Sequence, residues 1–285
     1  MLVEVVAAGL HRRVRSQADG SHYTSTGVLP LVPGIDGVGR LPDGTLRYFV
    51  LPDTTLGAMA ERTVIDLRRS LPLPDGADPV LVAAGINPAM SFRVALRQRV
   101  DFRAGQTVLI LGATGASGQM AVQVAKRLGA GEVIVAGRNT ERLAGLRDLG
   151  ADTLVRLQDT DELGKAADEV DVVIDYLWGA PTADALTAIA TNRRDDARPL
   201  TWIEIGSVAG PVAAIPSAAL RALPLQIVGS GQGSVSTAGI LAVLPELVDE
   251  ITSGALRIET RTVPLADVTS AWQDNDDTRR TVITP

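Results

Sequence analysis

The stretch that decides the fold runs from Thr107 to Ala130 and reads TVLILGATGASGQMAVQVAKRLGA. Residues 107–111 are aliphatic or β-branched, which predicts a buried strand. A turn with glycines at three-residue spacing follows. Residues 117–128 then carry an apolar stripe at helical spacing, which predicts a helix that ends at Gly129. The stretch therefore predicts a strand, a glycine turn and a helix in direct succession.

This succession is typical of a dinucleotide-binding unit. Glycine allows a tight turn at positive φ and lets the backbone approach a pyrophosphate, while the free N–H groups of the helix start face the phosphates. The spacing G-x-x-G-x-x-G is a variant of the usual fingerprint, and the flanking strand and helix support it. The alternative is a purely structural turn. The predicted cofactor-binding residues here are Gly112, Ala113, Thr114, Gly115, Ala116, Ser117 and Gly118.

The next predicted strand, 132–136, indicates which cofactor is bound. In sites that prefer NAD, an acidic residue about 20 positions beyond the glycines binds the ribose hydroxyls. That place falls on Arg138, and residues 133–140 contain no Asp or Glu. A guanidinium suits a 2′-phosphate, which a carboxylate would repel. The sequence therefore favours NADPH, unless Arg138 is only a solvated residue ahead of the next helix.

Strands and helices alternate after residue 100. The predicted strands are 107–111, 132–136, 153–155, 170–174, 201–205 and 225–228, with helices at 117–128, 140–149, 181–191 and 217–222. This pattern predicts an α/β fold with a complete, doubly wound parallel (Rossmann) sheet, whose ligand lies beyond the carboxyl ends of the strands. Two further cofactor contacts are expected there, at Gly206-Ser207 and Gly229-Ser230, with simple turn chemistry as the alternative.

The two ends of the chain have a different predicted secondary structure from its middle. Short predicted strands separated by turns, at 2–8 and 48–50 for example, indicate a β-rich domain. A helix at 240–251, a helix capped by Asp267 and a last strand at 281–283 follow the sheet, and this strand is expected to return to the β-rich domain. The resulting division is 1–86 for the first part of a catalytic domain, 87–228 for the cofactor-binding domain and 229–285 for the return.

Composition excludes several classes of protein. The chain of 285 residues has a net charge of −6, which gives no bulk attraction to nucleic acid. It has no cysteine and only two histidines, so disulfides, thiolate zinc sites and histidine-rich metal sites are excluded and no metal is expected. We expect no signal peptide and no membrane span, because the start lacks a basic region and no uncharged apolar run is long enough. A cytoplasmic protein is therefore expected.

These features together resemble the medium-chain dehydrogenase/reductase superfamily, in particular its zinc-independent quinone oxidoreductases. The segments that carry the resemblance are Val5–Leu10, Leu29–Gly39, Ala104–Gly118, Val122–Lys126, Asp171–Asp175, Val263–Val268 and Ala271–Trp272. The resemblance implies a GroES-like catalytic domain built from both chain ends, with the Rossmann domain inserted between them. It also implies NADPH, hydride transfer to an activated carbonyl or alkene, a small-molecule substrate and a homodimer.

The chain departs from the family pattern in three places. Zinc-dependent relatives have a cysteine where His11 stands and Gly-His-Glu where Ile35-Asp36-Gly37 stands. Quinone reductases usually have Asn-Pro near His11, so the usual substrate pocket is in doubt. The chain also begins at what would be the third strand of the family pattern, and we expect a shortened start or an unusually open site.

Three residues are candidates for the catalytic site. His11 lies where the family places a site residue, although a loop histidine is as often structural. Tyr23 precedes the Pro-Gly turn and could donate a proton to an enolate, the alternative being a packing role. Asn87 fits a loop near the nicotinamide, or else a helix cap or turn.

The resulting prediction is an NADPH-dependent oxidoreductase that transfers hydride to a quinone or an α,β-unsaturated carbonyl without zinc. A short-chain reductase is the second enzyme class considered, but it needs a Tyr-x-x-x-Lys pair, and Tyr176 is followed by Ala180. The alternative from another class is an NADPH-binding sensor or structural protein with little turnover.

Overall fold

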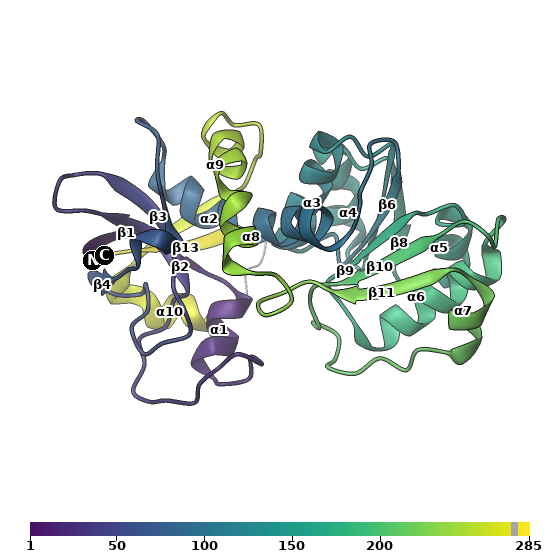
Figure 1. The fold of residues 1–285 in the computed structure, drawn as a ribbon, viewed down its shortest axis with the longest axis horizontal. Helices are drawn as coiled ribbons and strands as arrows, with labels where there is room; N and C mark the ends of the chain where they lie inside the picture. Colours follow the sequence, from purple (N-terminus) through teal and green to yellow (C-terminus); the bar gives the residue numbers. More distant parts are fainter. Residues whose placement is uncertain (275–278) are drawn as a thin grey trace. The chain divides into compact units, whose positions relative to one another are not determined.

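The protein forms two compact units. The structure, a computed structural model, describes residues 1–274 and 279–285. One unit comprises Met1–Met90 together with Ser236–Pro285, and the other comprises Ser91–Val235 (Figure 1). We call them the two-ended unit and the central unit.

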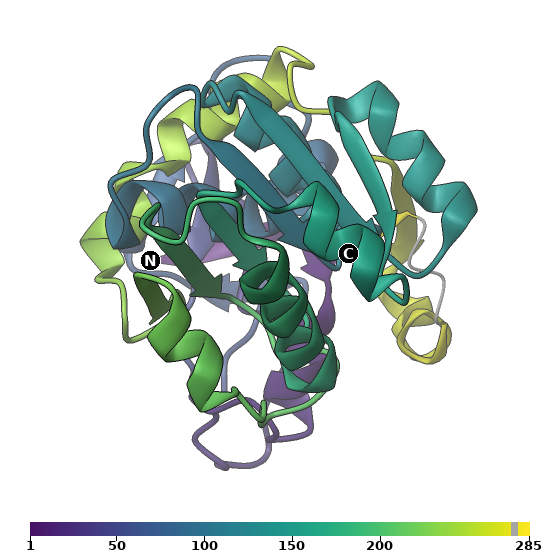
Figure 2. The same cartoon turned by 90° about the vertical axis from the view of Figure 1, so that its right-hand side faces the viewer.

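The central unit is built on a parallel sheet of six strands in the order β11-β10-β9-β6-β7-β8. These strands are β6 (Thr107–Leu111), β7 (Glu132–Gly137), β8 (Thr153–Arg156), β9 (Val172–Asp175), β10 (Leu200–Glu204) and β11 (Leu225–Gly229). The predicted doubly wound sheet is confirmed, and each predicted strand overlaps the observed one (Figure 2). The strand order reverses between β6 and β9, which is where such sheets bind their ligands.

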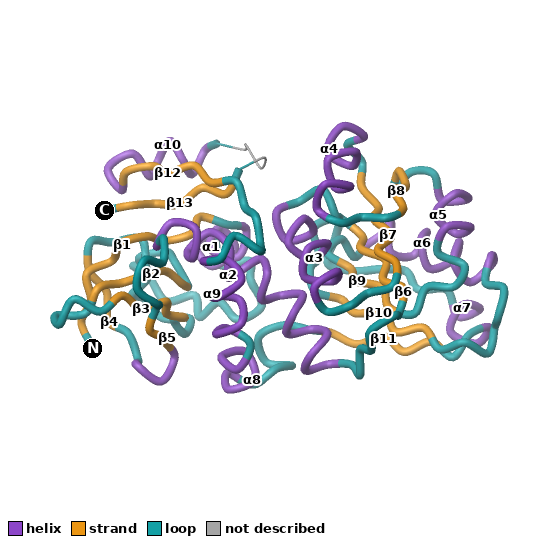
Figure 3. The backbone as a smooth tube through the Cα atoms, turned by 90° about the horizontal axis from the view of Figure 1, so that it is seen from above, coloured by secondary structure: helices purple, strands orange, loops and turns teal. Residues whose placement is uncertain are grey.

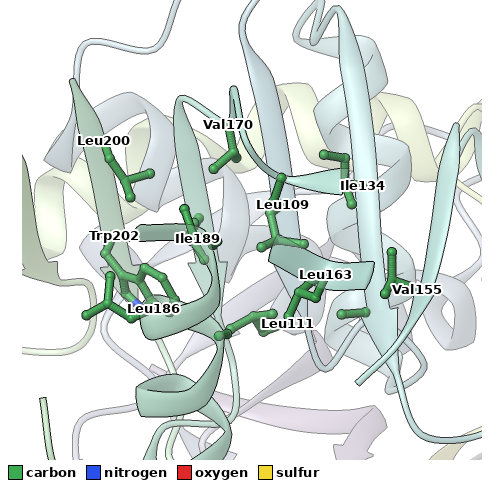
Figure 4. Packing of buried hydrophobic residues seen from close by; sticks show 14 of the residues in the cluster. Leu109, Leu111, Ile134, Val155, Leu163, Val170, Leu186, Ile189, Leu200 and Trp202 are labelled. Atoms are coloured by element: carbon green, nitrogen blue, oxygen red, sulfur yellow. The ribbon is translucent and has the colours of Figure 1, made fainter. Parts of the chain in front are cut away.

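Helices cover both faces of this sheet. They are α3 (Ala116–Arg127), α4 (Thr140–Gly145), the 3₁₀ helix η3 (Leu146–Leu149), α5 (Thr160–Ala166), α6 (Gly179–Asn192) and α7 (Ser217–Ala222). Figure 3 shows α3 and α4 on one side of the strands and α5, α6 and α7 on the other. The core between the sheet and the second group of helices includes Leu109, Ile134, Leu163, Leu186 and Trp202 (Figure 4), all fully buried.

The two-ended unit contains a seven-stranded sheet in the order β12-β13-β1-β2-β3-β5, with β4 also paired to β1. Its strands are β1 (Leu2–Leu10), β2 (Asp36–Arg40), β3 (Leu46–Val50), β4 (Arg62–Val64), β5 (Ser70–Pro72), β12 (Thr260–Pro264) and β13 (Arg280–Thr284). All pairs are antiparallel except β12 with β13. The predicted return of the chain end is confirmed, because β13 pairs with β1 and places Ile283 opposite Ala8.

The remaining helices are α1 (Arg12–Ala18), the 3₁₀ helix η1 (Leu67–Arg69), α2 (Pro79–Val94), the π-helical turn η2 (Ala95–Arg99), α8 (Thr237–Ala242), α9 (Leu244–Thr252), the 3₁₀ helix η4 (Leu265–Asp267) and α10 (Val268–Gln273). Helix α2 begins in the two-ended unit and ends in the central unit. By length and composition alone, Pro79–Arg99 could cross a membrane. However, 67% of the apolar 18-residue stretch within this segment is buried inside the protein, as in the core helix of a globular protein.

Three local predictions differ from the structure. Helix α2 continues through Pro88 and through Asn87, for which the sequence predicts a loop, a helix cap or a turn. Buried side chains on both sides of Pro88 favour the helix enough to offset the lost hydrogen bond. The helix predicted over 240–251 is two helices, since Pro245 cannot continue α8 and suits the first turn of α9. Asp267 precedes α10, but its side chain makes no capping hydrogen bond.

Candidate functional site

The carboxyl ends of the parallel strands bring together the residues predicted to bind a cofactor. Gly112 follows β6 and lies against the residues after β9: a Cβ on Gly112 would be 3.4 Å from Cβ of Tyr176. Gly206 follows β10 and lies against the same residue, because a Cβ there would be 3.2 Å from the Tyr176 carbonyl oxygen. These contacts join two of the predicted cofactor segments at the point where the strand order reverses.

The glycine turn has the shape of a phosphate cradle. Gly112 has a φ of +81°, a conformation that side chains disfavour. A Cβ on Gly118 would lie 2.4 Å from Cα of Ala113, so this glycine allows α3 to pack tightly on the turn. A Cβ on Gly115 would meet only the Gly112 carbonyl oxygen, at 3.6 Å. The open side of the turn at Gly115 therefore fits a group such as a pyrophosphate.

The start of α3 offers backbone N–H groups to this cradle. Its N-cap residue is Gly115, which has no side chain to cap the helix. The N–H of Gln119 donates to the Gly115 carbonyl at 2.9 Å, the first hydrogen bond of the helix. The N–H groups of the residues between them are those that an α-helix leaves unpaired. At the other end, the predicted stop is confirmed, since Gly129 has a φ of +86° and Ala130 N–H donates to the Ala125 carbonyl.

Arg138 stands beside the turn, exposed, directly after β7. A Cβ on Gly137 would lie 2.6 Å from Cγ2 of Thr114, so the end of β7 touches the glycine turn. The structure adds Arg156, which sequence reasoning missed. The β7–β8 register places Arg156 opposite Gly137, and its guanidinium Nε lies 3.8 Å from a carboxylate oxygen of Asp159. Its position directly after the predicted strand 153–155 could have indicated a place on the cofactor edge.

The two remaining predicted cofactor segments lie on the same edge of the sheet. Ser207 is exposed after β10. Ser230 is 7% exposed, and its N–H donates to the Glu204 carbonyl at 2.8 Å, which joins the ends of β11 and β10. The Gly229 carbonyl accepts a hydrogen bond from Nε of Arg99 at 2.8 Å. This edge thus continues from the glycine turn across Tyr176 to β11.

Tyr176 directly follows β9 and is part of this edge, as expected from its place at the carboxyl end of a predicted strand. Its hydroxyl lies 3.2 Å from Oγ of Ser91, and burial raises its pKa well above the usual range, so it stays a neutral phenol. The preceding residue, Asp175, is fully buried and accepts hydrogen bonds from four donors: the N–H groups of Leu177 and Trp178, the Thr182 hydroxyl and Nε1 of Trp202. This network fixes the backbone at the end of β9.

Among the predicted catalytic residues, His11 belongs to a buried polar group in the two-ended unit. It is 5% exposed, and its Nε2 lies 3.0 Å from Oδ1 of Asp36. The Tyr48 hydroxyl donates to Oδ2 of the same carboxylate at 2.7 Å. Burial lowers the pKa of His11, and Arg280 and Arg13 add to this effect, while the Asp36 charge opposes it. His11 is therefore held as a neutral imidazole.

Tyr23 and Asn87 are placed differently from His11. Tyr23 is 71% exposed, and its ring lies 4.2 Å from that of His22, between centroids. A pocket of about 170 Å³ is lined by Gln17, Leu29 and Asp53, among other residues. Tyr23 does not line this pocket, although several of the lining residues are its neighbours in sequence. Asn87 lies inside α2, so its expected place on a loop is wrong: the helix simply continues through it.

The described part of the chain contains no cluster of side chains suited to a metal ion. Among residues 1–274 and 279–285, no group of three or more His, Cys, Asp or Glu side chains could hold a metal ion.

The two histidines lead to a prediction about stability and pH. Both have a lowered pKa in the folded protein, that of His22 to about 4, chiefly because of burial. The unfolded chain therefore binds more protons below about pH 6.5, so the stabilising contribution is full above that pH and is lost as the pH falls. We expect the free energy of unfolding to decline between about pH 6.5 and 5. His11→Gln and His22→Gln should each make this decline shallower in urea titrations at several pH values. Identical slopes in the wild type and both variants would contradict this.

Comparison with known proteins identifies the family. Residues 116–194 match the model described as zinc-binding dehydrogenase. The chain is 31% identical to the "Probable NADPH-dependent quinone reductase tdiC" of Emericella nidulans, over 99% of this chain and 91% of that protein. It is 28% identical to the chloroplastic NADPH-dependent alkenal/one oxidoreductase of Arabidopsis thaliana, over 62% of this chain and 50% of that one.

A solved structure supports the same conclusion. The quinone oxidoreductase of Thermus thermophilus, solved alone and in complex with NADPH, is 26% identical and superposes with a TM-score of 0.82, over 100% of this chain and 91% of that chain. The predicted resemblance is thereby confirmed. The chain belongs to the medium-chain dehydrogenase/reductase superfamily, as a member of its zinc-independent, quinone oxidoreductase-like group.

Proposed function

We propose that this protein is an NADPH-dependent oxidoreductase that transfers hydride to a quinone or an α,β-unsaturated carbonyl without zinc. The observation that carries the proposal is the cradle at the end of β6. It has an open side at Gly115, uncapped N–H groups at the start of α3, and Arg138 directly after the neighbouring strand. Relatives that bear the names of NADPH-dependent quinone and alkenal/one reductases support it.

Different segments of the central unit would bind different parts of NADPH. NADPH, when bound, supplies the hydride. The turn from Gly112 to Gly118 and the start of α3 would hold its pyrophosphate, and Arg138 would pair with its 2′-phosphate. The segments at Gly206-Ser207 and Gly229-Ser230 would line the rest of the cofactor along the same edge. Arg156, brought opposite Gly137 by strand pairing, would add a second positive charge near the 2′-phosphate.

The acceptor class follows from the chemistry available. Addition of hydride to a conjugated acceptor gives a delocalised anion, which needs little acid catalysis. A simple alcohol must lose a proton as hydride leaves, and relatives that oxidise alcohols use zinc to stabilise the alkoxide. The chain has no cysteine, and the catalytic candidates are His11, Tyr23 and Asn87, none of them part of a metal-ligand cluster among the described residues.

The division of labour between the units is part of this proposal. The central unit, 91–235 in the structure and 87–228 by sequence, would bind the cofactor. The two-ended unit would supply the catalytic residues, as its family membership suggests. We further propose that the protein acts in the cytoplasm as a homodimer.

The proposal predicts the outcome of an acceptor panel. NADPH consumption should be measurable with 1,4-naphthoquinone and with 2-cyclohexenone, and reduction of NADP⁺ by simple alcohols should be negligible. Chelator treatment should change neither rate nor melting temperature. Robust alcohol turnover with neither acceptor reduced would overturn the proposal. NADPH binding with no turnover at all would favour the alternative, a sensor or structural protein.

A further inference from the structure

One residue of the central unit has a backbone conformation that its side chain disfavours. Trp178, three positions after the end of β9, has a φ of +54° and a ψ of −167°. Such combinations are populated almost only by glycine, because a Cβ crowds the neighbouring backbone. In the described part of the chain, Trp178 is the one residue other than glycine with a positive φ. Strain of this kind persists only where the surrounding structure imposes it, and it gathers at ligand-binding sites.

The carboxylate of Asp175 holds Trp178 in this conformation. Oδ1 of Asp175 accepts the N–H groups of Leu177, at 2.8 Å, and of Trp178, at 3.0 Å. Oδ2 accepts from the Thr182 hydroxyl and from Nε1 of Trp202. Asp175 is fully buried, so the loss of these donors would leave a carboxylate unpaired and away from water. The cost of breaking this network maintains the strain at Trp178.

The loop that follows β10 fixes the same segment from the other side. The N–H of Ala209 donates to the Leu177 carbonyl at 2.8 Å. A Cβ on Gly179 would lie 3.1 Å from the carbonyl carbon and oxygen of Ala209, so the two backbones are in close contact. The residues on both sides of Trp178 are therefore held, which prevents the backbone from relaxing to a commoner φ.

Residues 176–178 extend from the glycine turn to the loop after β10. At one end, a Cβ on Gly112 would lie 2.9 Å from Cδ2 of Leu177. At the other end, the loop after β10 meets Gly179. Neighbouring strands lie about 4.8 Å apart, so β6 and β10, with β9 between them, are about 10 Å apart. A nucleoside attached to a pyrophosphate at the glycine turn would cross this stretch.

The half of NADPH that would cross it is the nicotinamide half. Arg138 follows β7, which lies on the opposite side of β6 from β9. In the proposed function, Arg138 pairs with the 2′-phosphate of the adenosine half. A dinucleotide extends in both directions from its pyrophosphate, so the nicotinamide half would lie over β9 and β10. Trp178 follows β9 and is therefore on the path of that half.

Contacts within the protein do not explain why a tryptophan occupies this position. The side chain of Trp178 is half-buried. Trp202 donates its Nε1 to Asp175, whereas Nε1 of Trp178 makes no hydrogen bond in the part of the chain that the structure describes. Among the same residues, Trp178 makes no ring contact, unlike Trp272, which has the Arg15 guanidinium 5.4 Å from its ring centroid. Glycine would avoid the strain, so the indole indicates a use for a flat aromatic surface.

We propose that Trp178 is a positioning residue for the cofactor, whose indole packs against the dihydronicotinamide ring and holds it at the end of β9. This rests on the proposed function. Flat aromatic rings attract one another in an offset stack. The constrained backbone orients the indole before the cofactor arrives, so little conformational freedom is lost on binding. Asp175 acts through Trp178, because it holds the backbone of that residue.

Two variants that both lack the indole test the strain. Trp178→Ala keeps a Cβ at positive φ, whereas Trp178→Gly removes it. We expect the melting temperature of Trp178→Gly to exceed that of Trp178→Ala by about 2–4 °C. At an unstrained position the order would be reversed, because glycine loses more conformational entropy on folding. An equal or higher melting temperature for Trp178→Ala would show that the position is not strained and would overturn the proposal.

Two other variants, which keep a bulky apolar side chain, test the contact with the cofactor. Trp178→Phe retains an aromatic face and Trp178→Leu does not. By isothermal titration calorimetry, Trp178→Phe should bind NADPH with a Kd within about threefold of that of the unmodified protein, and Trp178→Leu with a Kd raised about tenfold or more. The control ligand is 2′,5′-ADP, which has the 2′-phosphate but no nicotinamide, and its Kd should be equal in all three proteins. These two variants keep the test open if Trp178→Ala or Trp178→Gly fails to fold.

The outcomes separate this inference from the proposed function. If the unmodified protein binds neither NADPH nor 2′,5′-ADP, the proposed function fails, and this inference with it. If it binds both, and Trp178→Leu binds NADPH as tightly as Trp178→Phe does, the positioning role alone is overturned. Equal weakening of NADPH and 2′,5′-ADP in Trp178→Leu would assign the residue a purely structural role and would also overturn it.

Discussion

Gly115→Ala is expected to weaken NADPH binding by about 10- to 100-fold, because loss of one charge-assisted hydrogen bond costs about 1.5–3 kcal/mol. The new Cβ would meet only the Gly112 carbonyl oxygen, at 3.6 Å, so the fold tolerates it. It would instead occupy the open side of the turn, where the backbone must approach the pyrophosphate. The dissociation constant can be measured from NADPH fluorescence, with the melting temperature recorded beside it.

Gly118→Ala is the matched control within the same turn. Here the Cβ would lie 2.4 Å from Cα of Ala113 and 2.6 Å from the Gly112 oxygen, so the backbone must move. We expect the melting temperature to fall by about 5 °C or more, as for other overpacked sites. Tight NADPH binding by Gly115→Ala would show that the open side does not receive the cofactor. An unchanged melting temperature for Gly118→Ala would contradict the packing at the turn.

Arg138→Asp is expected to weaken NADPH by about 100-fold, since a charge-assisted pairing is lost and a repulsive carboxylate is introduced. NADH, which has no 2′-phosphate, should bind about as before. Arg156→Ala should reduce the same preference to a smaller extent, because its ion pair with Asp159, at 3.8 Å, competes for the guanidinium.

Arg103→Asp provides the control for charge alone. Arg103 is exposed and precedes β6, so it lies toward the amino end of the strand, away from the cofactor edge. Its substitution should alter NADPH and NADH binding equally and only slightly. A lower dissociation constant for NADH than for NADPH in the unmodified protein would show that Arg138 does not select the cofactor.

The sequence by itself determined the central unit and its binding edge. Buried strands such as 107–111 are read from short apolar runs, and the glycines at 112, 115 and 118 mark a turn whose geometry depends on local backbone freedom. In a parallel sheet, the carboxyl ends of all strands lie on one edge. Once the strands were predicted, the neighbourhood of Gly112, Tyr176 and Gly206 followed from topology.

The tertiary structure alone decided three other features. Helix α2 runs through Pro88 because packing on both sides outweighs a local preference that the sequence expresses strongly. Arg156 lies opposite Gly137 through the register of β8 against β7, which its place at the end of a predicted strand does not by itself give. His11, Asp36 and Tyr48 meet because β1, β2 and β3 pair antiparallel, across 25 and 12 positions of chain. Strand register depends on contacts between distant segments, so a histidine that reads as a loop residue in sequence becomes part of a buried, oriented group only in the folded protein.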